Sequence, residues 1–180
     1  GDLLQTLHLS TASKTLPTPG THHLAFSPND KLLATGNIDN TIDLWEVDTG
    51  KLITAFQSPN TSGQLNAGLT FSPDGTLLAS AGDYPQSELL WDVHTGKLVK
   101  ALRDTCDSVI FSPDGSLLLC SSSSGGYFSL WNVQSGKQLY STNNTGVCGE
   151  DPLITLRFSP DAKRIAFGCN NSIQLWGVEG

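Results

Sequence analysis

The chain has 180 residues, of which 15% are charged, and its formal net charge at pH 7 is −7. Nucleic-acid binding draws on Lys and Arg that neutralise phosphates, and the ten present here are scattered singly, which argues against a nucleic-acid partner. The same acidity argues against anionic membrane surfaces, and no apolar run reaches the roughly 18 residues that a membrane span requires.

The first predicted element is a strand in Gly1–Leu7, because these residues align with the Gly-Lys-Leu segments that follow two later Trp turns. After it, a two-part pattern recurs four times: Phe-Ser-Pro with a turn, and then Leu-Trp. The Phe residues are 26, 71, 111 and 158, and the Trp residues are Trp45, Trp91, Trp131 and Trp176. A period of 40 to 47 residues between successive Phe predicts units that stack to bury a shared core.

Each unit contains four predicted short strands, which we call a to d in chain order. Strand a ends at the Phe, a Ser-Pro-Asp-Gly turn leads into the apolar strand b, and strand c ends in Leu-Trp. A turn of the type Thr-Gly-Lys then leads to strand d. We expect one segment of four units at about 17–56, 66–102, 107–141 and 152–180, the last completed by residues 1–7.

Four short antiparallel strands per unit at this period are typical of a propeller blade. The repeats resemble the WD-repeat β-propellers, in which FSPDG follows strand a and a Trp-Asp pair closes strand c. The resemblance covers essentially the whole chain and implies an all-β fold with four WD-type blades. The pair Trp91-Asp92 is the one literal Trp-Asp, and the Gly-His dipeptide that precedes strand a in the family is missing.

The resemblance also implies roles for polar residues inside the blades. In the family, a buried network joins that His, a Ser or Thr on strand b, an Asp in the b–c turn and the Trp. Thr35, Asp39 and Trp45 match three of these members in the first unit, whereas the other units lack the Asp. Because a half-satisfied buried network costs free energy, we expect the other blades to rely on apolar packing.

The two ends of the chain raise the question of how a ring closes. Gly1–Leu7 looks like a strand d without a, b and c before it, and the fourth unit reaches Gly180 without a strand d. Closed propellers leave no sheet edge unpaired. Three alternatives stay open: a four-bladed ring from one chain, an eight-bladed ring from a homodimer that exchanges its first strands, or a fragment of a longer propeller.

The sequence predicts no catalytic residue, metal ligand or cofactor site. The serine tract at 121–124 lacks a nucleophile elbow, and His22 and His23 would point to opposite sides of one strand. No Cys-x-x-Cys pair exists, and Cys120 is expected to be a buried thiol on strand b. Quinone-cofactor propellers share the Thr-Gly-Lys turn but place their Trp after the Gly, so an enzyme or cofactor binder is the weakest alternative.

In the WD-repeat family, the d–a and b–c loops share the face on which partner peptides usually dock. Aromatic and acidic residues in these loops would suit a basic or polar protein segment. The resemblance therefore implies a non-catalytic scaffold for protein–protein interaction, cytoplasmic by default, with secretion left open. The competing hypothesis is a structural module that assembles with copies of itself. The candidate partner-binding residues are His22, Asp39, Tyr84, Asp104, Asp107, Glu150 and Asp151.

Overall fold

The computed structural model describes residues 1–3, 5–7, 21–37, 39–58, 65–82, 88–102, 106–122, 127–142, 155–169 and 171–178. The described residues contain strands and no helix, and the strands form four antiparallel sheets. Three sheets have four strands and the last has three. The structure thus confirms the predicted all-β fold with four blades.

Each sheet is a meander in which strands adjacent in sequence are hydrogen-bonded neighbours. The first sheet comprises β1 (Thr21–Phe26), β2 (Leu32–Asn37), β3 (Thr41–Glu46) and β4 (Leu52–Gln57). The second comprises β5 (Leu65–Phe71), β6 (Leu77–Gly82), β7 (Glu88–Asp92) and β8 (Leu98–Leu102). The third comprises β9 (Ser108–Phe111), β10 (Leu117–Ser122), β11 (Tyr127–Asn132) and β12 (Gln138–Ser141). The fourth comprises β13 (Thr155–Phe158), β14 (Arg164–Cys169) and β15 (Ser172–Gly177).

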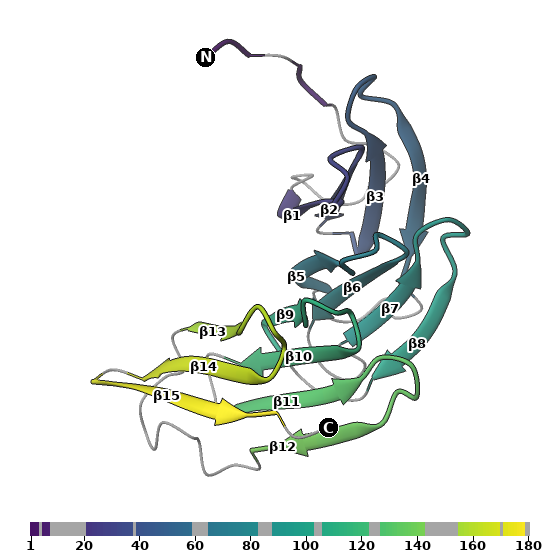
Figure 1. Ribbon diagram of the computed structural model, residues 1–180. Coiled ribbons are helices and arrows are strands. Elements are labelled where there is room, and N and C mark those ends of the chain that lie inside the picture. Colours follow the sequence, from purple (N-terminus) through teal and green to yellow (C-terminus); the bar gives the residue numbers. More distant parts are fainter. Residues whose placement is uncertain are drawn as a thin grey trace.

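The four sheets stack face to face in a curved row (Figure 1). Strands β1, β5, β9 and β13 lie on the inner side of the curve, and β4, β8 and β12 lie on the outer side. Three apolar clusters fill the spaces between consecutive sheets, the first around Phe56 and Trp91, the second around Leu90 and Trp131, and the third around Phe128. The core therefore lies between the sheets, as expected for stacked repeats.

The predicted turn after strand a is held by its own side chains. In the second sheet, the Ser72 hydroxyl donates to Asp74 Oδ1 at 2.6 Å, and the backbone N–H of Leu77 donates to Ser72 Oγ at 2.9 Å. The hydrogen bonds from Ser72 and from the Thr76 backbone lower the pKa of Asp74. The fourth turn position has a positive φ, which Gly75 adopts without strain. The same contacts recur in the other three sheets, so the motif fixes the hairpin rather than a binding site.

The two end sheets expose apolar side chains that the inner sheets bury. Ile173 and Leu175 on β15 are 80% and 70% exposed, and Leu24 and Phe26 on β1 also face solvent. The residues that match Ile173 and Leu175 in the first three sheets are at most 6% exposed, and the apolar ones are Ile42, Leu44, Leu90, Phe128 and Leu130. The exposure follows from the missing neighbour at each end of the row and not from a change in sequence.

The first residues lie at the opposite end of the row from β15 (Figure 1). The described residues of Gly1–Leu7 carry no strand, and the Gln5 side chain donates to the backbone carbonyl of Thr49 at 3.0 Å, in the turn between β3 and β4. Within one chain, this segment therefore does not complete the fourth sheet. The open row of four sheets keeps the two ends of the chain apart (Figure 1). Closure of a ring by residues 1–7 therefore stays a prediction, and it concerns an assembly of more than one chain.

Candidate functional site

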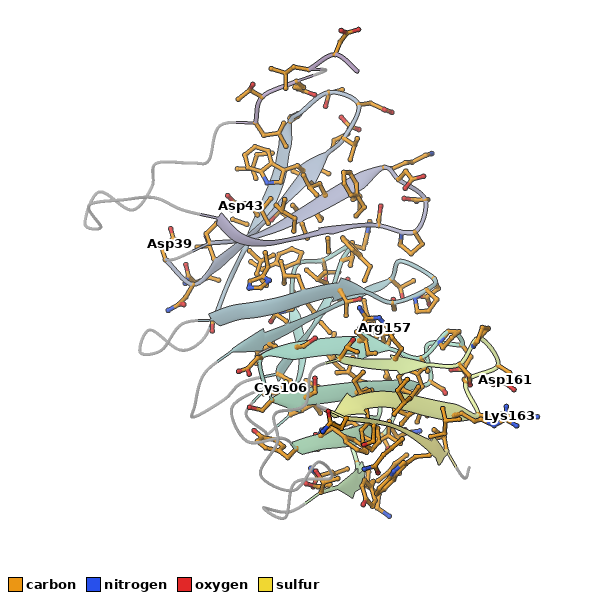
Figure 2. All side chains as sticks on the ribbon, turned by 90° about the vertical axis from the view of Figure 1, so that its left-hand side faces the viewer. Asp39, Asp43, Cys106, Arg157, Asp161 and Lys163 are labelled. Atoms are coloured by element: carbon orange, nitrogen blue, oxygen red, sulfur yellow. A yellow bond between two sulfur atoms is a disulfide. The ribbon has the colours of Figure 1, made fainter. Side chains whose placement is uncertain are left out.

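The meander order places alternate connections at opposite ends of each sheet. The b–c connections and the connections from one sheet to the next share one end, while the a–b and c–d turns share the other. Figure 2 shows this division: Asp39, Asp43 and Cys106 lie on one side of the molecule, and Asp161 and Lys163 lie on the other. The described members of the predicted partner-binding set belong to the first side.

Two of the predicted partner-binding residues have described side chains. Asp39 is half-buried, and its Oδ1 accepts hydrogen bonds from the Thr41 hydroxyl at 2.6 Å and the Thr41 backbone N–H at 3.2 Å. Asp107 is half-buried just before β9, and its Oδ2 accepts from the Ser122 hydroxyl at 3.5 Å. Both carboxylates therefore help to hold the ends of strands, whatever else they bind.

The other five candidates have no described side chain. The backbone of His22 lies in β1, but its side chain is outside the described set. The remaining predicted residues lie outside the described residues, and they are Tyr84, Asp104, Glu150 and Asp151.

The Trp of each blade donates its indole N–H to a nearby oxygen. In the first two sheets the acceptor lies across the sheet on strand b: Trp45 Nε1 is 3.1 Å from Thr35 Oγ1, and Trp91 Nε1 is 3.1 Å from Ser80 Oγ. Asp39 bonds to Thr41 in the b–c turn, and no hydrogen bond in the described residues joins it to Trp45 or Thr35. Thr35 and Trp45 thus form a pair, and Asp39 bonds to Thr41 instead.

In the last two sheets the Trp finds its acceptor on its own strand. Cys120 and Phe167 occupy the strand-b position there, and neither supplies a hydroxyl. Trp131 Nε1 donates to Ser129 Oγ at 2.9 Å, and Trp176 Nε1 donates to Gln174 Oε1 at 3.3 Å. An acceptor two residues before the Trp thus replaces the missing strand-b hydroxyl.

Asp43 is a buried carboxylate that the sequence analysis did not single out. It lies on β3 directly across from Thr35 and is 3% exposed. Burial raises its pKa, a hydrogen bond with Asn37 lowers it, and the charge of Asp39 raises it again, so that the net change is upward. The b–c end of the first sheet thus holds two close carboxylates, one of them in a poorly solvated place.

A second unpredicted cluster lies between the second and third sheets. The Glu88 side chain is 0% exposed, and its Oε1 is 2.8 Å from Cys106 Sγ and 2.6 Å from Cys120 Sγ. Cys106 and Cys120 are joined as a disulfide, with their Cα atoms 5.7 Å apart. The three side chains form the one group of potential metal ligands that the described residues bring within 4.8 Å. They come from β7, from the segment before β9 and from β10.

This cluster corrects the expectation of a free thiol, while the expectation of no metal ligand stays a prediction. Cys120 is buried as predicted, but it is bonded to Cys106 and is not a free thiol. The prediction of no metal ligands rested on the absence of a Cys-x-x-Cys pair, whereas these cysteines are 14 residues apart. A signal was present in the repeats: Glu88 stands three residues before its Trp, where the other units have Ile42, Phe128 and Ile173.

The described residues form a framework of sheets with one buried polar cluster. In the described part of the chain, no helix is long and apolar enough to cross a membrane.

Comparisons with known proteins agree with the repeat pattern. A family model described as "WD domain, G-beta repeat" matches residues 11–46 and 89–132. The chain is also similar to proteins named eukaryotic translation initiation factor 3 subunit I. It is 50% identical over 52 residues to the one from Phaeosphaeria nodorum and 41% identical over 51 residues to the one from Pyricularia oryzae. These alignments cover 29% and 28% of this chain, and each spans 14% of the relative's length.

The strand-b hydroxyl can be tested in the first sheet. Replacing Thr35→Val removes the acceptor of the buried Trp45 indole and should lower the free energy of unfolding by about 1–3 kcal/mol. The control Thr35→Ser keeps the hydroxyl and loses a methyl group, which should lower the free energy of unfolding by about 1 kcal/mol. Urea unfolding gives the free energies, and hydrogen exchange of the indole N–H should accelerate in the valine variant only. Equal exchange in both variants would contradict the pairing.

Asp43 predicts a pH dependence of stability. The pKa of Asp43 in the folded state lies above the ordinary 3.8. Its favourable contribution to the free energy of unfolding is therefore complete below pH 3.8 and is lost as the pH rises through the folded-state pKa. Asp43→Asn, which keeps the shape, should therefore be more stable than the parent at neutral pH, and the difference should vanish on acidification. Urea midpoints measured across this range provide the check, with Asp48→Asn in the exposed c–d turn as control. A difference that grows toward acid would contradict the prediction.

Proposed function

The chain belongs to the WD-repeat β-propeller family, and we propose that it is a non-catalytic scaffold that binds a basic protein segment on the b–c side of its blades. The observation that carries this proposal is that two carboxylates of different sheets lie on that same side. Asp39 belongs to the first sheet, and Asp107 directly follows Cys106 before the third sheet (Figure 2). The chain's 17 acidic and 10 basic residues favour a partner of positive charge.

The relatives support a protein partner but do not identify it. Their name describes a subunit of a translation initiation factor, which is a protein that works within an assembly. Because the alignments span 14% of those proteins, a place in translation initiation is a proposal for this chain, and so is the cytoplasm as its location. Association of the tagged chain with purified initiation factor 3 subunits would test this finer step.

A second candidate function is supported by the end faces of the row. The exposed Ile173 and Leu175 occupy positions that are buried wherever another sheet follows, so the fourth sheet has the surface of an inner blade. The strand β15 is also the outermost strand of a three-stranded sheet. A second copy could cover this face with its first sheet, which exposes Leu24 and Phe26, and could supply its Gly1–Leu7 as the fourth strand.

The scaffold proposal predicts a binding surface with a defined side. Asp39→Asn together with Asp107→Asn should weaken binding of a Lys- and Arg-rich peptide about three- to tenfold, because each rim charge contributes little alone. The matched control Asp48→Asn removes an exposed charge from the c–d side and should leave binding unchanged. Fluorescence anisotropy with a labelled peptide at two salt concentrations gives the affinities. Equal weakening by the control, or none by the double variant, would overturn the proposed side.

The assembly candidate predicts a dimer of twice 19.2 kDa in light scattering. Ile173→Lys with Leu175→Lys should convert this dimer to a monomer, because charged groups at these positions oppose burial. Val99→Lys, at an exposed apolar site on β8, is the control and should leave the mass unchanged. Deleting residues 1–7 should also weaken the dimer. A folded parent chain that is a monomer at every concentration would exclude this candidate.

A further inference from the structure

The buried polar cluster occupies a place where the next interface holds two aromatic rings. Phe128 and Phe167 are the counterparts of Glu88 and Cys120 one blade later, and their ring centroids lie 5.5 Å apart. An apolar pair is therefore sufficient for packing two blades at these positions. The exchange of a ring for a carboxylate cannot be explained by packing alone.

A carboxylate in this position requires compensation. Glu88 lies against an apolar cluster that includes Leu90, Leu118 and Trp131. Moving a carboxylate into such surroundings costs several kcal/mol unless it is paired with hydrogen-bond donors or a positive charge. Its neighbours within hydrogen-bonding distance include the two sulfurs at 2.6 and 2.8 Å, so what they offer the carboxylate depends on their oxidation state.

The sulfur pair has two states with opposite consequences for Glu88. As two thiols, both sulfurs carry a hydrogen and can donate to Oε1. As a disulfide, neither sulfur has a hydrogen, and the carboxylate oxygen faces their lone pairs. The placement of the carboxylate next to both sulfurs is therefore unfavourable for the disulfide and favourable for the reduced pair, although the Cα spacing of 5.7 Å also allows the disulfide.

We propose that Glu88, Cys106 and Cys120 bind a divalent metal ion of the zinc class when the cysteine pair is reduced, and that the disulfide excludes the ion. Zinc accepts thiolate sulfur at about 2.3 Å and carboxylate oxygen at about 2.0–2.2 Å in a tetrahedral shell. Two thiolates favour zinc over magnesium or calcium, which prefer oxygen alone. Rotations about the side-chain bonds of the reduced cysteines separate the sulfurs enough for one ion, and water completes the shell.

The charge balance favours the metal over the empty dithiolate. Two thiolates and a carboxylate carry three negative charges in a place with no solvent exposure at Glu88, and a divalent ion cancels two of them. The ligands belong to the second and third sheets, so the ion would join two blades. This inference goes beyond the scaffold proposal, because the site is buried between blades and takes no part in the loop surface.

The two states interconvert by two-electron chemistry. A phosphine breaks the S–S bond: it gives two electrons to the sulfurs and takes oxygen from water, whose two protons go to the thiols. Binding of the ion then releases these two protons. An azodicarboxamide oxidant removes two electrons from the thiolates and takes up two protons at its nitrogens, while the S–S bond forms and the ion leaves.

The experiment uses the full chain reduced with a phosphine under anaerobic conditions and titrated with Co²⁺. The expected result is one cobalt per chain with a thiolate-to-cobalt charge-transfer band, which Zn²⁺ then removes by displacement. Glu88→Gln should weaken cobalt binding by about tenfold or more while keeping the band. Cys120→Ser and Cys106→Ser should each lose affinity and band intensity. Oxidation with the azodicarboxamide should release the ion and give a chain two hydrogens lighter.

Controls separate the proposed site from other thiols and from unfolding. Cys169→Ser changes a cysteine of the fourth sheet and should leave cobalt binding unchanged. Near-ultraviolet circular dichroism of the Trp residues reports whether each variant is folded. Should a Cys variant fail to fold, Glu88→Gln and the oxidised parent chain provide the comparison.

Three results would overturn the inference. The first is a folded, reduced chain that binds no cobalt. The second is a charge-transfer band that survives Cys106→Ser and Cys120→Ser and disappears in Cys169→Ser. The third is an oxidised chain that binds cobalt as tightly as the reduced one. None of these outcomes bears on peptide binding by the loop side, so the two proposals fail independently.

Discussion

Burial of apolar side chains between neighbouring sheets holds this molecule together, because each four-stranded sheet has two faces to cover and no core of its own. The three clusters between the sheets hold all the buried apolar side chains of the described residues except Trp45. Local features such as the Ser72–Asp74 turn set the shape of each sheet, but they cover little surface. The apolar surface that this chain exposes therefore depends on which sheet faces have a neighbour and which do not.

The three interfaces meet this requirement with different chemistry. The first stacks Phe56 on Trp91 with ring centroids 5.6 Å apart, and the third gathers three aromatic rings around Phe128. The second places Glu88 and Cys120 at the positions that Phe128 and Phe167 hold in the third. Volume and shape are thus the common condition, since cores tolerate changes of residue when these are kept. The second interface therefore meets the same packing condition and also holds a reactive group, the cysteine pair.

The sequence alone was enough to predict the four blades and the turn after strand a. These features lie within single repeats, so comparing the repeats with one another reveals them. The Glu88 cluster was not predicted, because its members come from two blades and their contact depends on how the sheets stack. Gln174 as the acceptor of Trp176 was missed for a different reason: the expected acceptor is a strand-b hydroxyl, and Phe167 at that position has none.

The choice of two acceptor positions for the indole N–H has an evolutionary consequence. A blade that loses its strand-b hydroxyl keeps its Trp satisfied if a polar residue already stands two places before it, as Ser129 does beside Cys120. Duplicated repeats can therefore drift apart one substitution at a time without passing through an unstable intermediate. The freed strand-b position then becomes available for a new role, and Cys120, now part of the buried cluster, occupies such a position.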